Sequence, residues 1–442
     1  MKLLLRGGRV VDPARGIDGS FDVLLADGRV ERVERDLPAA GAHVIEVPRG
    51  WVVCPGFIDM HVHLREPGQE HKETVATGAA AAVAGGFTAV ACMPNTDPVN
   101  DHAAVTELIL QKAAEAGLAR VYPIGAVSRG SQGEALADIG ELRRAGCVAV
   151  SDDGRPVATA LLMRRALEYA GMFGMPVIDH CEEPTLRGEG VAHEGAVATA
   201  LGLRGIPAAA EEIAVERDIA LAAATGGRVH IAHLSVRGAL RAVRDGKARG
   251  VKVTCEVTPH HFTLTHEALY GYDTNVKMNP PLREPADRDA ILQGLADGTV
   301  DAIATDHAPH HYDEKLVEFD RAPFGIVGLE TAVPLAFDRL VHTGLIGLSR
   351  LVELLSANPA RILGVPGGTL EPGSPADVTL VVPDLEVIVD AASFRSKGRN
   401  TPFDGWRLRG GVGATIVGGR IVYVNAAAPG AEAFAPVAAA SG

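Results

Sequence analysis

The sequence lacks an excess of positive charge. Its 442 residues include 42 Lys and Arg against 55 Asp and Glu, a formal net charge of −13. Contacts to phosphate groups need clustered Lys and Arg, so this balance argues against a protein that binds nucleic acid or an anionic membrane. Aromatic residues are also scarce, at 4%. We therefore expect neither nucleic acid nor membrane among its partners.

Cysteine is rare, and no two cysteines have the CxxC spacing. The five are spread along the chain: Cys54, Cys92, Cys147, Cys181 and Cys255. Most lie in apolar runs, where a buried free thiol is the usual state. Thiols stay reduced in the cytosol, so the pattern predicts a cytoplasmic protein. The apolar stretch within residues 1–6 is too short for a signal peptide.

Long hydrophobic runs are absent apart from one uncharged stretch, residues 74–96. It consists mostly of Ala, Gly and Thr, and Gly85 and Gly86 interrupt it. A helix followed by a buried strand accounts for such a stretch better than a membrane span does.

The sequence does have enough apolar residues to bury a large core. Hydrophobic residues make up 47% of the chain and charged residues 22%. A length of 442 residues corresponds to two or three domains, or to one large domain with an appendage. The 51 Gly and 27 Pro suit many tight turns between short elements.

The two ends of the chain are alike and differ from the middle. Short runs of β-forming residues, such as 22–25 and 377–382, alternate there with turn pairs. Neither end has enough strands for a stable sheet by itself. We therefore predict that residues 1–54 and 365–425 pair into one small composite β domain, a β-sandwich. Residues 426–442, rich in Ala, Pro and Gly, are predicted to be a disordered tail.

Residues 55–364 repeat a short apolar run followed by an Ala-rich helical stretch. The predicted strands cover residues 56–59, 87–92, 119–124, 147–151, 176–179, 228–232, 251–257 and 300–305. Eight alternating β/α units over about 300 residues are typical of a (β/α)8 TIM barrel, an α/β fold. A doubly wound open sheet is the alternative, but no GxGxxG follows any early strand.

Candidate metal ligands follow several of these strands. In an extended chain, residues i and i+2 point to the same face, so His61 and His63 can bind one metal ion together. The C-terminal ends of barrel strands converge, so ligand-type residues after the other strands should meet them. These residues are Asp152, Asp153, His180, His233, Asp306 and His307. The alternative is that each of these residues merely caps a strand or helix. This explanation would have to apply independently at every one of these strand ends.

One ligand from each of the later strand ends, together with His61 and His63, gives four His and two Asp, which exceed the four ligands of a tetrahedral zinc ion. Such a set suits two divalent ions about 3.5–4 Å apart that share a carboxylate. Water bound to such ions loses its proton readily and is a nucleophile at neutral pH. Asp59, in the first predicted strand, has two interpretations: it binds metal, or it orients an imidazole instead.

Two longer motifs carry a family resemblance. Residues 56–68 (Gly-Phe-Ile-Asp-Met-His-Val-His-Leu-Arg-Glu-Pro-Gly) and 304–310 (Ala-Thr-Asp-His-Ala-Pro-His) resemble the two signatures of the dihydroorotases of the amidohydrolase superfamily. Further matches lie at residues 93–96, 151–154, 258–261, 277–283, 323–325 and 400–403. The resemblance covers essentially the whole chain. It implies a metal-bearing (β/α)8 barrel with a small β domain built from both termini.

The resemblance also implies a set of ligands for two zinc ions per chain. One ion is expected on His61, His63 and Asp306, and the other on His180 and His233, with Asp153 as the bridge. Many relatives use a carboxylated lysine as the bridge, but no Lys lies near the end of the fourth strand. This matches the bacterial subclass with an Asp bridge. Asp152 and Asp153 point opposite ways in an extended chain, and the family pattern selects Asp153.

Dihydroorotate carries one carboxylate and several ring amide groups, so its site needs a cation and amides. Arg65 can bind the carboxylate with two parallel N–H groups, and Asn95 can support it. For Arg65 the alternative is a surface ion pair with Glu66. The substrate contacts that the resemblance implies are His63, Leu64, Arg65, Asn95, Asn279, His310, Phe324 and Gly325.

The activity that the resemblance implies is the interconversion of N-carbamoyl-L-aspartate and L-dihydroorotate in pyrimidine biosynthesis. Asp306 is the expected catalytic residue, moving a proton between the attacking water and the leaving nitrogen. Two alternatives stay open. One is a hydantoinase, dihydropyrimidinase or allantoinase, which share the ligand pattern but generally have a lysine bridge. The other is a non-catalytic structural homologue, although such proteins lose ligands and all six are present here.

Two further expectations concern the surroundings of the site. The charged stretch 309–323 is either a mobile lid over the substrate or a solvated connection. The protein is expected to be a homo-oligomer that acts on a small molecule, with aspartate transcarbamoylase as a further partner because some relatives bind it.

Overall fold

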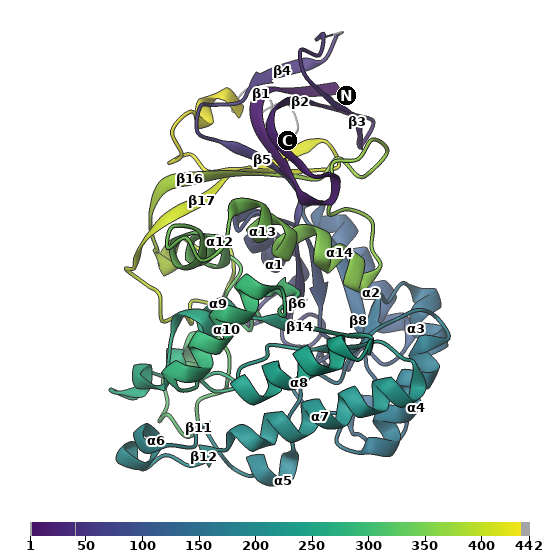
Figure 1. Ribbon diagram of the computed structural model, residues 1–442, viewed down its shortest axis with the longest axis vertical. Helices are drawn as coiled ribbons and strands as arrows, with labels where there is room; N and C mark the ends of the chain where they lie inside the picture. The colour runs from purple at the N-terminus through teal and green to yellow at the C-terminus, as the bar shows by residue number, and fades with distance from the viewer. Residues whose placement is uncertain (1, 40, 435–442) are drawn as a thin grey trace.

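The largest part of the molecule is a barrel of parallel strands (Figure 1). The computed structural model describes residues 2–39 and 41–434. The barrel strands are β6 (Phe57–Val62), β7 (Phe87–Cys92), β8 (Arg120–Gly125), β9 (Ala149–Val150), β10 (Val177–Asp179), β13 (Val229–Ile231), β14 (Val253–Val257) and β15 (Ala302–Ile303). They are hydrogen-bonded in chain order from β6 to β15. A parallel bridge between Val62 and His307 brings the two outer strands together, which nearly closes the barrel. The predicted (β/α)8 barrel is confirmed.

Helices connect the strands on the outside of the barrel. The main ones are α1 (Val75–Ala84), α2 (Ala103–Ala116), α3 (Ile139–Ala145), α4 (Ala160–Gly171), α7 (Ala208–Thr225), α8 (Arg237–Ala248) and α10 (Pro285–Asp297). The uncharged stretch 74–96 forms α1 and β7, as predicted. At the start of α1, Thr74 accepts the N–H of Thr77, and the Thr77 side chain accepts the N–H of Thr74. None of the described helices is both long enough and apolar enough to cross a bilayer.

All eight predicted strands form, but several are shorter than expected. Strands β9 and β15 have two residues each, because the chain leaves the ladder to enter the loops that carry Asp153 and Asp306. The five cysteines are free and buried, as predicted. Burial raises the pKa of the Cys92 thiol to about 12.

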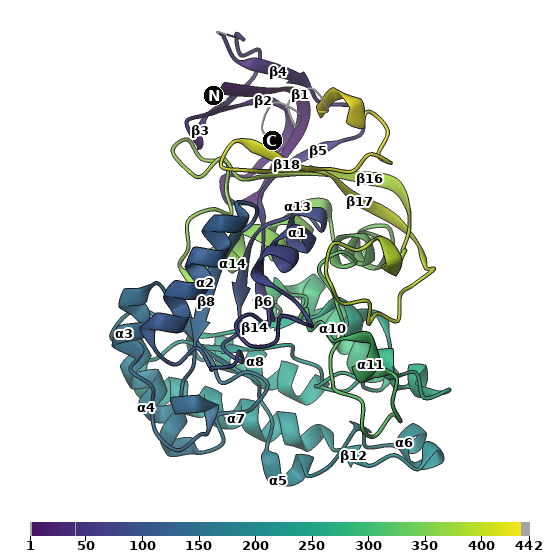
Figure 2. The ribbon, with the colours of Figure 1, turned by 180° about the vertical axis from the view of Figure 1, so that it is seen from behind.

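The two ends of the chain meet in a second sheet (Figure 2). Its strands are β1 (Lys2–Asp12), β2 (Ile17–Ala26), β3 (Arg29–Glu34), β4 (His43–Glu46), β5 (Val52–Pro55), β16 (Val378–Ile388), β17 (Arg407–Val417) and β18 (Arg420–Val424). Strand β5 pairs with both β1 and β16 and so joins the two ends. All eight strands belong to one hydrogen-bonded sheet, and most of its buried apolar residues form one core.

This terminal sheet is fastened to the barrel next to α1 and β7. The Thr379 hydroxyl donates to the carbonyl of Gly86, and the Thr415 hydroxyl donates to the carbonyl of Val83, both at 2.7 Å. Strands β16 and β17 lie between the rest of the sheet and the barrel in both views (Figures 1 and 2). The sheet therefore packs beside the starts of β6 and β7, at the ends of these strands that lie away from the loops described next.

The prediction of a disordered tail is wrong for residues 426–434. They end in a short 3-10 helix, η8 (Ala431–Phe434), whose Phe434 is fully buried. The Phe434 ring stacks on Trp51, with centroids 5.1 Å apart and planes 9° apart. Trp51 Nε1 donates to the carbonyl of Pro429 at 2.8 Å. The burial of an apolar ring thus outweighs the loop-like composition of this segment. Residues 435–442 lie outside the described part of the chain.

Candidate active site

The predicted ligands come together at the C-terminal ends of the barrel strands. His61 lies in β6 with His63 directly after it, and the others follow the ends of four further strands: Asp153 after β9, His180 after β10, His233 after β13 and Asp306 after β15. All six side chains are buried. Parallel strands of a barrel end on one face, which is why residues up to 245 positions apart meet here.

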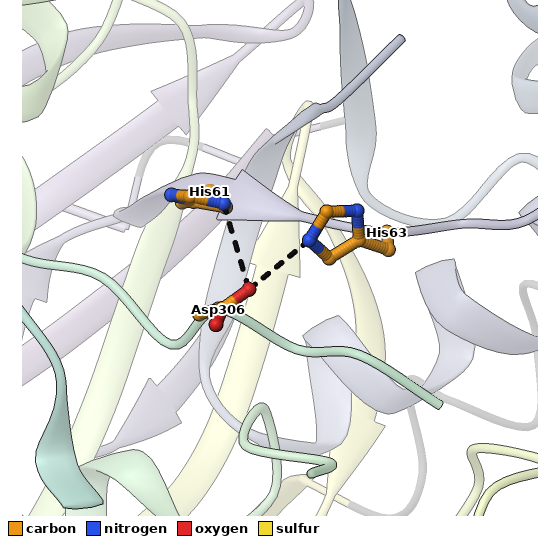
Figure 3. A group of neighbouring side chains, drawn as sticks. All are labelled: His61, His63 and Asp306. Atoms are coloured by element: carbon orange, nitrogen blue, oxygen red, sulfur yellow. Dashed lines mark hydrogen bonds and ion pairs between the residues drawn. The ribbon is translucent and has the colours of Figure 1, made fainter. Parts of the chain in front are cut away.

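Asp306 lies between the first two histidines (Figure 3). Its Oδ1 atom is 3.5 Å from His61 Nε2 and 3.0 Å from His63 Nε2. The three side chains form a group whose ligand atoms lie within 4.8 Å of one another. This geometry can hold a metal ion.

Asp153 lies between this group and the other two histidines. Its Oδ2 is 3.4 Å from His61 Nε2 and 3.5 Å from His63 Nε2. Its Oδ1 is 3.7 Å from His180 Nδ1 and 3.5 Å from His233 Nε2. Those two ring nitrogens are 2.9 Å apart. One carboxylate therefore faces two pairs of imidazoles, one pair with each oxygen.

The neighbouring Asp152 points away from the site. Its two oxygens accept the backbone N–H and the hydroxyl of Ser128. The choice between the two adjacent aspartates, which extended-chain geometry left open, is thus made by the strand end: Asp153 faces the cluster and Asp152 holds the loop after β8.

Opposite charges stabilise one another inside the cluster. Burial alone raises the pKa of Asp153, but the charge on His61 and the nearby rings of His180 and His233 hold it well below its usual value. Burial lowers the pKa of His180, but the carboxylates of Asp153 and Glu182 outweigh burial and raise it to about 10. The carboxylates are therefore ionised beside a concentration of positive charge.

Three residues of the site have a left-handed backbone, which is rare outside glycine. The φ angles are +63° at Arg65, +32° at His233 and +49° at Asp306. Such residues cost on the order of 1–3 kcal/mol each and persist where the surrounding structure holds them, often at active sites. Here they turn the chain sharply just beyond the ends of β6, β13 and β15.

A cavity of about 470 Å³ opens above the cluster. Seven of the eight predicted substrate contacts line it: His63, Arg65, Asn95, Asn279, His310, Phe324 and Gly325. Leu64 is the exception and a correction. Its side chain points into the apolar core beside Gly78 of α1, because it alternates with His63 and Arg65 along the chain.

Arg65 is a buried cation beside the cavity. Its side chain donates to the carbonyl of Pro309 at 3.3 Å, and burial lowers its pKa to about 10. None of the described ion pairs joins it to Glu66, which instead accepts the N–H of Val75 at 2.9 Å. The surface ion pair considered for Arg65 is therefore wrong. Asn95 Oδ1 is 2.9 Å from His63 Nδ1, so this amide orients an imidazole as well as lining the cavity.

The opposite wall carries the remaining predicted contacts. Asn279 Nδ2 is 3.0 Å from His180 Nε2. His310 Nε2 donates to the carbonyl of Phe324 at 2.8 Å, which leaves His310 Nδ1 as a buried acceptor with no hydrogen-bond partner. Burial and the nearby Arg65 lower the pKa of His310 to about 3, so this ring is neutral.

Several residues of the site were not predicted from the sequence. Glu182, Arg155 and Arg187 line the cavity, and Glu256 contacts His61 Nδ1 at 2.7 Å from below. A charged residue inside an apolar strand is unusual unless it is paired, so Glu256 could have been singled out on that ground. Glu182 and Arg155 lie in loops and Arg187 ends the short helix α5 (Pro184–Arg187), and none of the three carries such a signal.

Asp59 does not orient an imidazole as the sequence suggested. Its Oδ1 accepts the backbone N–H groups of His61 and Thr305, each at 3.1 Å. It thereby joins the first barrel strand to the last, next to Asp306. Whether Asp59 contacts a ring or the backbone depends on the register of the neighbouring strands, which the residues around Asp59 do not specify.

Hydrogen bonds from two lysines hold the stretch 309–323 against neighbouring parts of the chain. This stretch contains the short helix α11 (Tyr312–Lys315). Lys315 Nζ donates to the carbonyls of Thr274 and Pro323 at 3.1 and 2.8 Å. Lys277 Nζ donates to those of Phe319 and Asp320 at 2.7 and 3.0 Å. The stretch borders the cavity through His310, and its role as a mobile lid stays a prediction.

The chain is similar in sequence to one family of known proteins. The "Dihydro-orotase-like" family model matches residues 50–239. The chain is 58% identical over 422 residues to the dihydroorotase of Pelotomaculum thermopropionicum, covering 96% of this chain and 98% of that protein. It is 60% identical over 427 residues to that of Anaeromyxobacter dehalogenans strain 2CP-C, covering 95% and 98%.

Solved structures share the fold at lower identity. An L-hydantoinase (dihydropyrimidinase) from Arthrobacter aurescens superimposes with a TM-score of 0.86 at 24% identity, covering 96% of both chains. A D-hydantoinase (dihydropyrimidinase) from Thermus sp. does so with a TM-score of 0.81 at 26% identity, again covering 96% of both. At these identities the likeness concerns the fold, whereas the closer sequence relatives carry one name. The chain belongs to the dihydroorotase family.

Proposed function

We propose that this protein hydrolyses the ring amide of L-dihydroorotate and, in reverse, closes N-carbamoyl-L-aspartate to the ring. The observation that carries the proposal is the position of Asp153, with one oxygen toward His61 and His63 and the other toward His180 and His233. A shared carboxylate between two ligand sets is the arrangement of a two-ion hydrolase.

The donor set fits two zinc ions. His61 Nε2 and Asp153 Oδ1 are buried and have no hydrogen-bond partner, although both point into the cluster. Buried polar atoms rarely stay unpaired unless something else binds them. In the proposal His61, His63 and Asp306 hold one ion, His180 and His233 hold the other, and Asp153 bridges. When bound, such ions lower the pKa of a water molecule and polarise the ring carbonyl.

Asp306 is the proposed proton carrier. Its carboxylate borders the cavity, and its Oδ1 contacts His63 Nε2 at 3.0 Å. In the hydrolytic direction it accepts a proton from the attacking water and delivers it to the leaving ring nitrogen. In the cyclisation direction the same group starts protonated.

The substrate carboxylate is proposed to bind Arg65 and Asn95, whereas the acceptor Nδ1 of His310 is proposed to face a ring N–H of the substrate. The guanidinium of Arg65 supplies the charge, and burial strengthens its interaction with an anion. Asn95 Oδ1 faces His63, and its Nδ2 is proposed to donate to the substrate. On the other wall, Asn279 and the backbone of Phe324 and Gly325 are proposed to contact the ring amides.

One assay separates this function from its rivals. Metal content and turnover of dihydroorotate are measured beside hydantoin, dihydrouracil and allantoin on the same preparation. We expect close to two divalent ions per chain and a clear preference for dihydroorotate. Preference for one of the other three substrates contradicts the proposed substrate, and full activity without metal contradicts the two-ion mechanism. Cytoplasmic location, self-association and binding to aspartate transcarbamoylase stay predictions.

A further inference from the structure

Glu256, in β14, lies in the barrel interior beneath the cluster and is 1% exposed. Its Oε1 is 2.7 Å from His61 Nδ1, and its Oε2 is 3.2 Å from His230 Nε2. Oε1 also accepts the backbone N–H of His233, at 3.4 Å. One carboxylate therefore contacts His61 of the first ligand set and His233 of the second.

These contacts decide which nitrogen of His61 faces the cluster. Both oxygens of the Glu256 carboxylate face ring nitrogens, Oε1 that of His61 and Oε2 that of His230. A carboxylate oxygen accepts a hydrogen bond from the ring nitrogen that it contacts, so His61 Nδ1 is the donor. His61 Nε2 is left facing Asp153 and Asp306, at 3.4 and 3.5 Å.

Glu256 also supports the strained turn that carries His233. The left-handed φ of +32° at His233 needs support from its surroundings. The carboxylate of Glu256 accepts the N–H of His233, and the backbone carbonyl of Glu256 accepts the N–H of Leu234 at 2.9 Å. The side chain and the backbone of one residue thus hold consecutive N–H groups of this turn.

His230 completes the arrangement from the side away from the cluster. It is fully buried, and its Nδ1 is 2.8 Å from the Thr254 hydroxyl. With His230 on Oε2 and His61 on Oε1, the carboxylate is held at both oxygens and cannot rotate without breaking a hydrogen bond.

We propose that Glu256 is a positioning residue that sets the spacing between the two ligand sets. The inference rests on the proposed two-ion site, and Glu256 itself touches neither substrate nor reacting atoms. Removing a group that orients a ligating histidine typically weakens metal binding about 10–100-fold. Because Glu256 contacts both sets, its removal weakens the binding of both ions.

The test is titration of Zn²⁺ into metal-free Glu256→Gln, with Asp22→Asn as the matched control. Asp22 is a buried carboxylate of the terminal sheet that accepts the N–H groups of Gly7 and Leu37, each at 2.8 Å. We expect both binding steps of Glu256→Gln to weaken about 10–100-fold, while Asp22→Asn binds as the wild type does. The absorption spectrum of the Co²⁺-loaded protein should change in Glu256→Gln alone, because it reports ligand geometry.

Wild-type affinity in both steps would show that Glu256 is merely a buried structural acid, and a loss confined to one step would overturn the coupling. If Glu256→Gln does not fold, Glu256→Asp takes its place. Asp keeps the charge but is one methylene too short to reach His61 and His230 together, so it too should weaken both steps. Wild-type binding by Glu256→Asp overturns the proposal. The proposed function is tested separately, on the wild-type protein. It fails if the wild type binds fewer than two ions or does not turn over dihydroorotate.

Discussion

The ammonium group of Lys277 lies against the ring of Phe324, 4.7 Å from its centroid, while the carbonyl of Lys277 accepts the N–H of Gly325 at 2.9 Å. The same ammonium group donates to the carbonyls of Phe319 and Asp320. Lys277 therefore ties the cavity wall at Phe324 and Gly325 to the stretch 309–323.

Lys277→Met should raise the KM for dihydroorotate about tenfold or more, with a smaller change in kcat and no change in metal content. Each hydrogen bond from a charged group contributes about 1.5–3 kcal/mol, and the variant loses two of them next to the proposed ring contacts. Steady-state kinetics and elemental analysis measure this. Lys252→Met is the control, since Lys252 donates to the carbonyl of Gly226 at an exposed site. An unchanged KM in Lys277→Met contradicts this role.

Arg65→Met should lower kcat/KM by about 3–5 kcal/mol, the effect of removing one partner of a buried charge pair. Metal content should stay at the wild-type value. Arg65→Lys should restore little activity, because an ammonium group lacks the two parallel donors of a guanidinium. A near-normal kcat/KM in Arg65→Met means that the substrate carboxylate binds elsewhere.

Asp306→Asn separates metal binding from proton transfer. Asn keeps the shape and one oxygen but cannot accept the proton. We expect the variant to keep much of its metal and to lose about 10²–10⁴-fold in kcat, the usual contribution of general acid–base catalysis. An Asp306→Asn protein that is active with a full complement of metal shows that another group moves the proton.

The two reaction directions should depend on pH with opposite signs. Burial alone raises the pKa of Asp306, but the hydrogen bond from His63 and the charge on His61 hold it below its usual value. Hydrolysis needs the ionised carboxylate and should fall as the pH drops toward that pKa. Cyclisation needs the protonated form and should rise over the same range. Rates of both directions on one preparation check this, and profiles that rise and fall together contradict it.

Phe434→Ala should lower the free energy of unfolding by about 3–5 kcal/mol, the range for deleting a buried aromatic ring. The loss arises because the ring is fully buried and stacked on Trp51. Tyr270→Ala, at a side chain that is 60% exposed, is the control and should change stability by less than about 0.5 kcal/mol. Equal thermal unfolding of the two variants would show that residues 426–434 add nothing to the fold.

Most of the barrel could be predicted because its signals are local. Strand β7 and helix α2 have the boundaries that the apolar run at 87–92 and the Ala-rich stretch at 103–116 indicate. The pair His61 and His63 follows from the two-residue period of a strand. The same period, carried one residue further, places Leu64 in the core.

Other parts of the site depend on contacts between distant segments. Asp59 binds backbone N–H groups on two strands, and Glu256 binds rings from β6 and β13. Nothing next to either residue in the chain specifies these partners. The burial of Phe434 likewise depends on Trp51, which lies in the other half of the terminal sheet.

The sequence by itself determined the eight β/α units, the pairing of the two ends, the six ligand-type residues at strand ends and the family, because periodicity and motifs are properties of neighbouring residues. Only the tertiary structure decided that Asp153 rather than Asp152 faces the histidines, that Arg65 is buried beside the cavity, and that Glu256 links the two ligand sets. These outcomes depend on strand register and on backbone turns at positive φ. Both are set by the packing of the closed barrel, because the neighbouring strands fix the direction in which the chain leaves each strand.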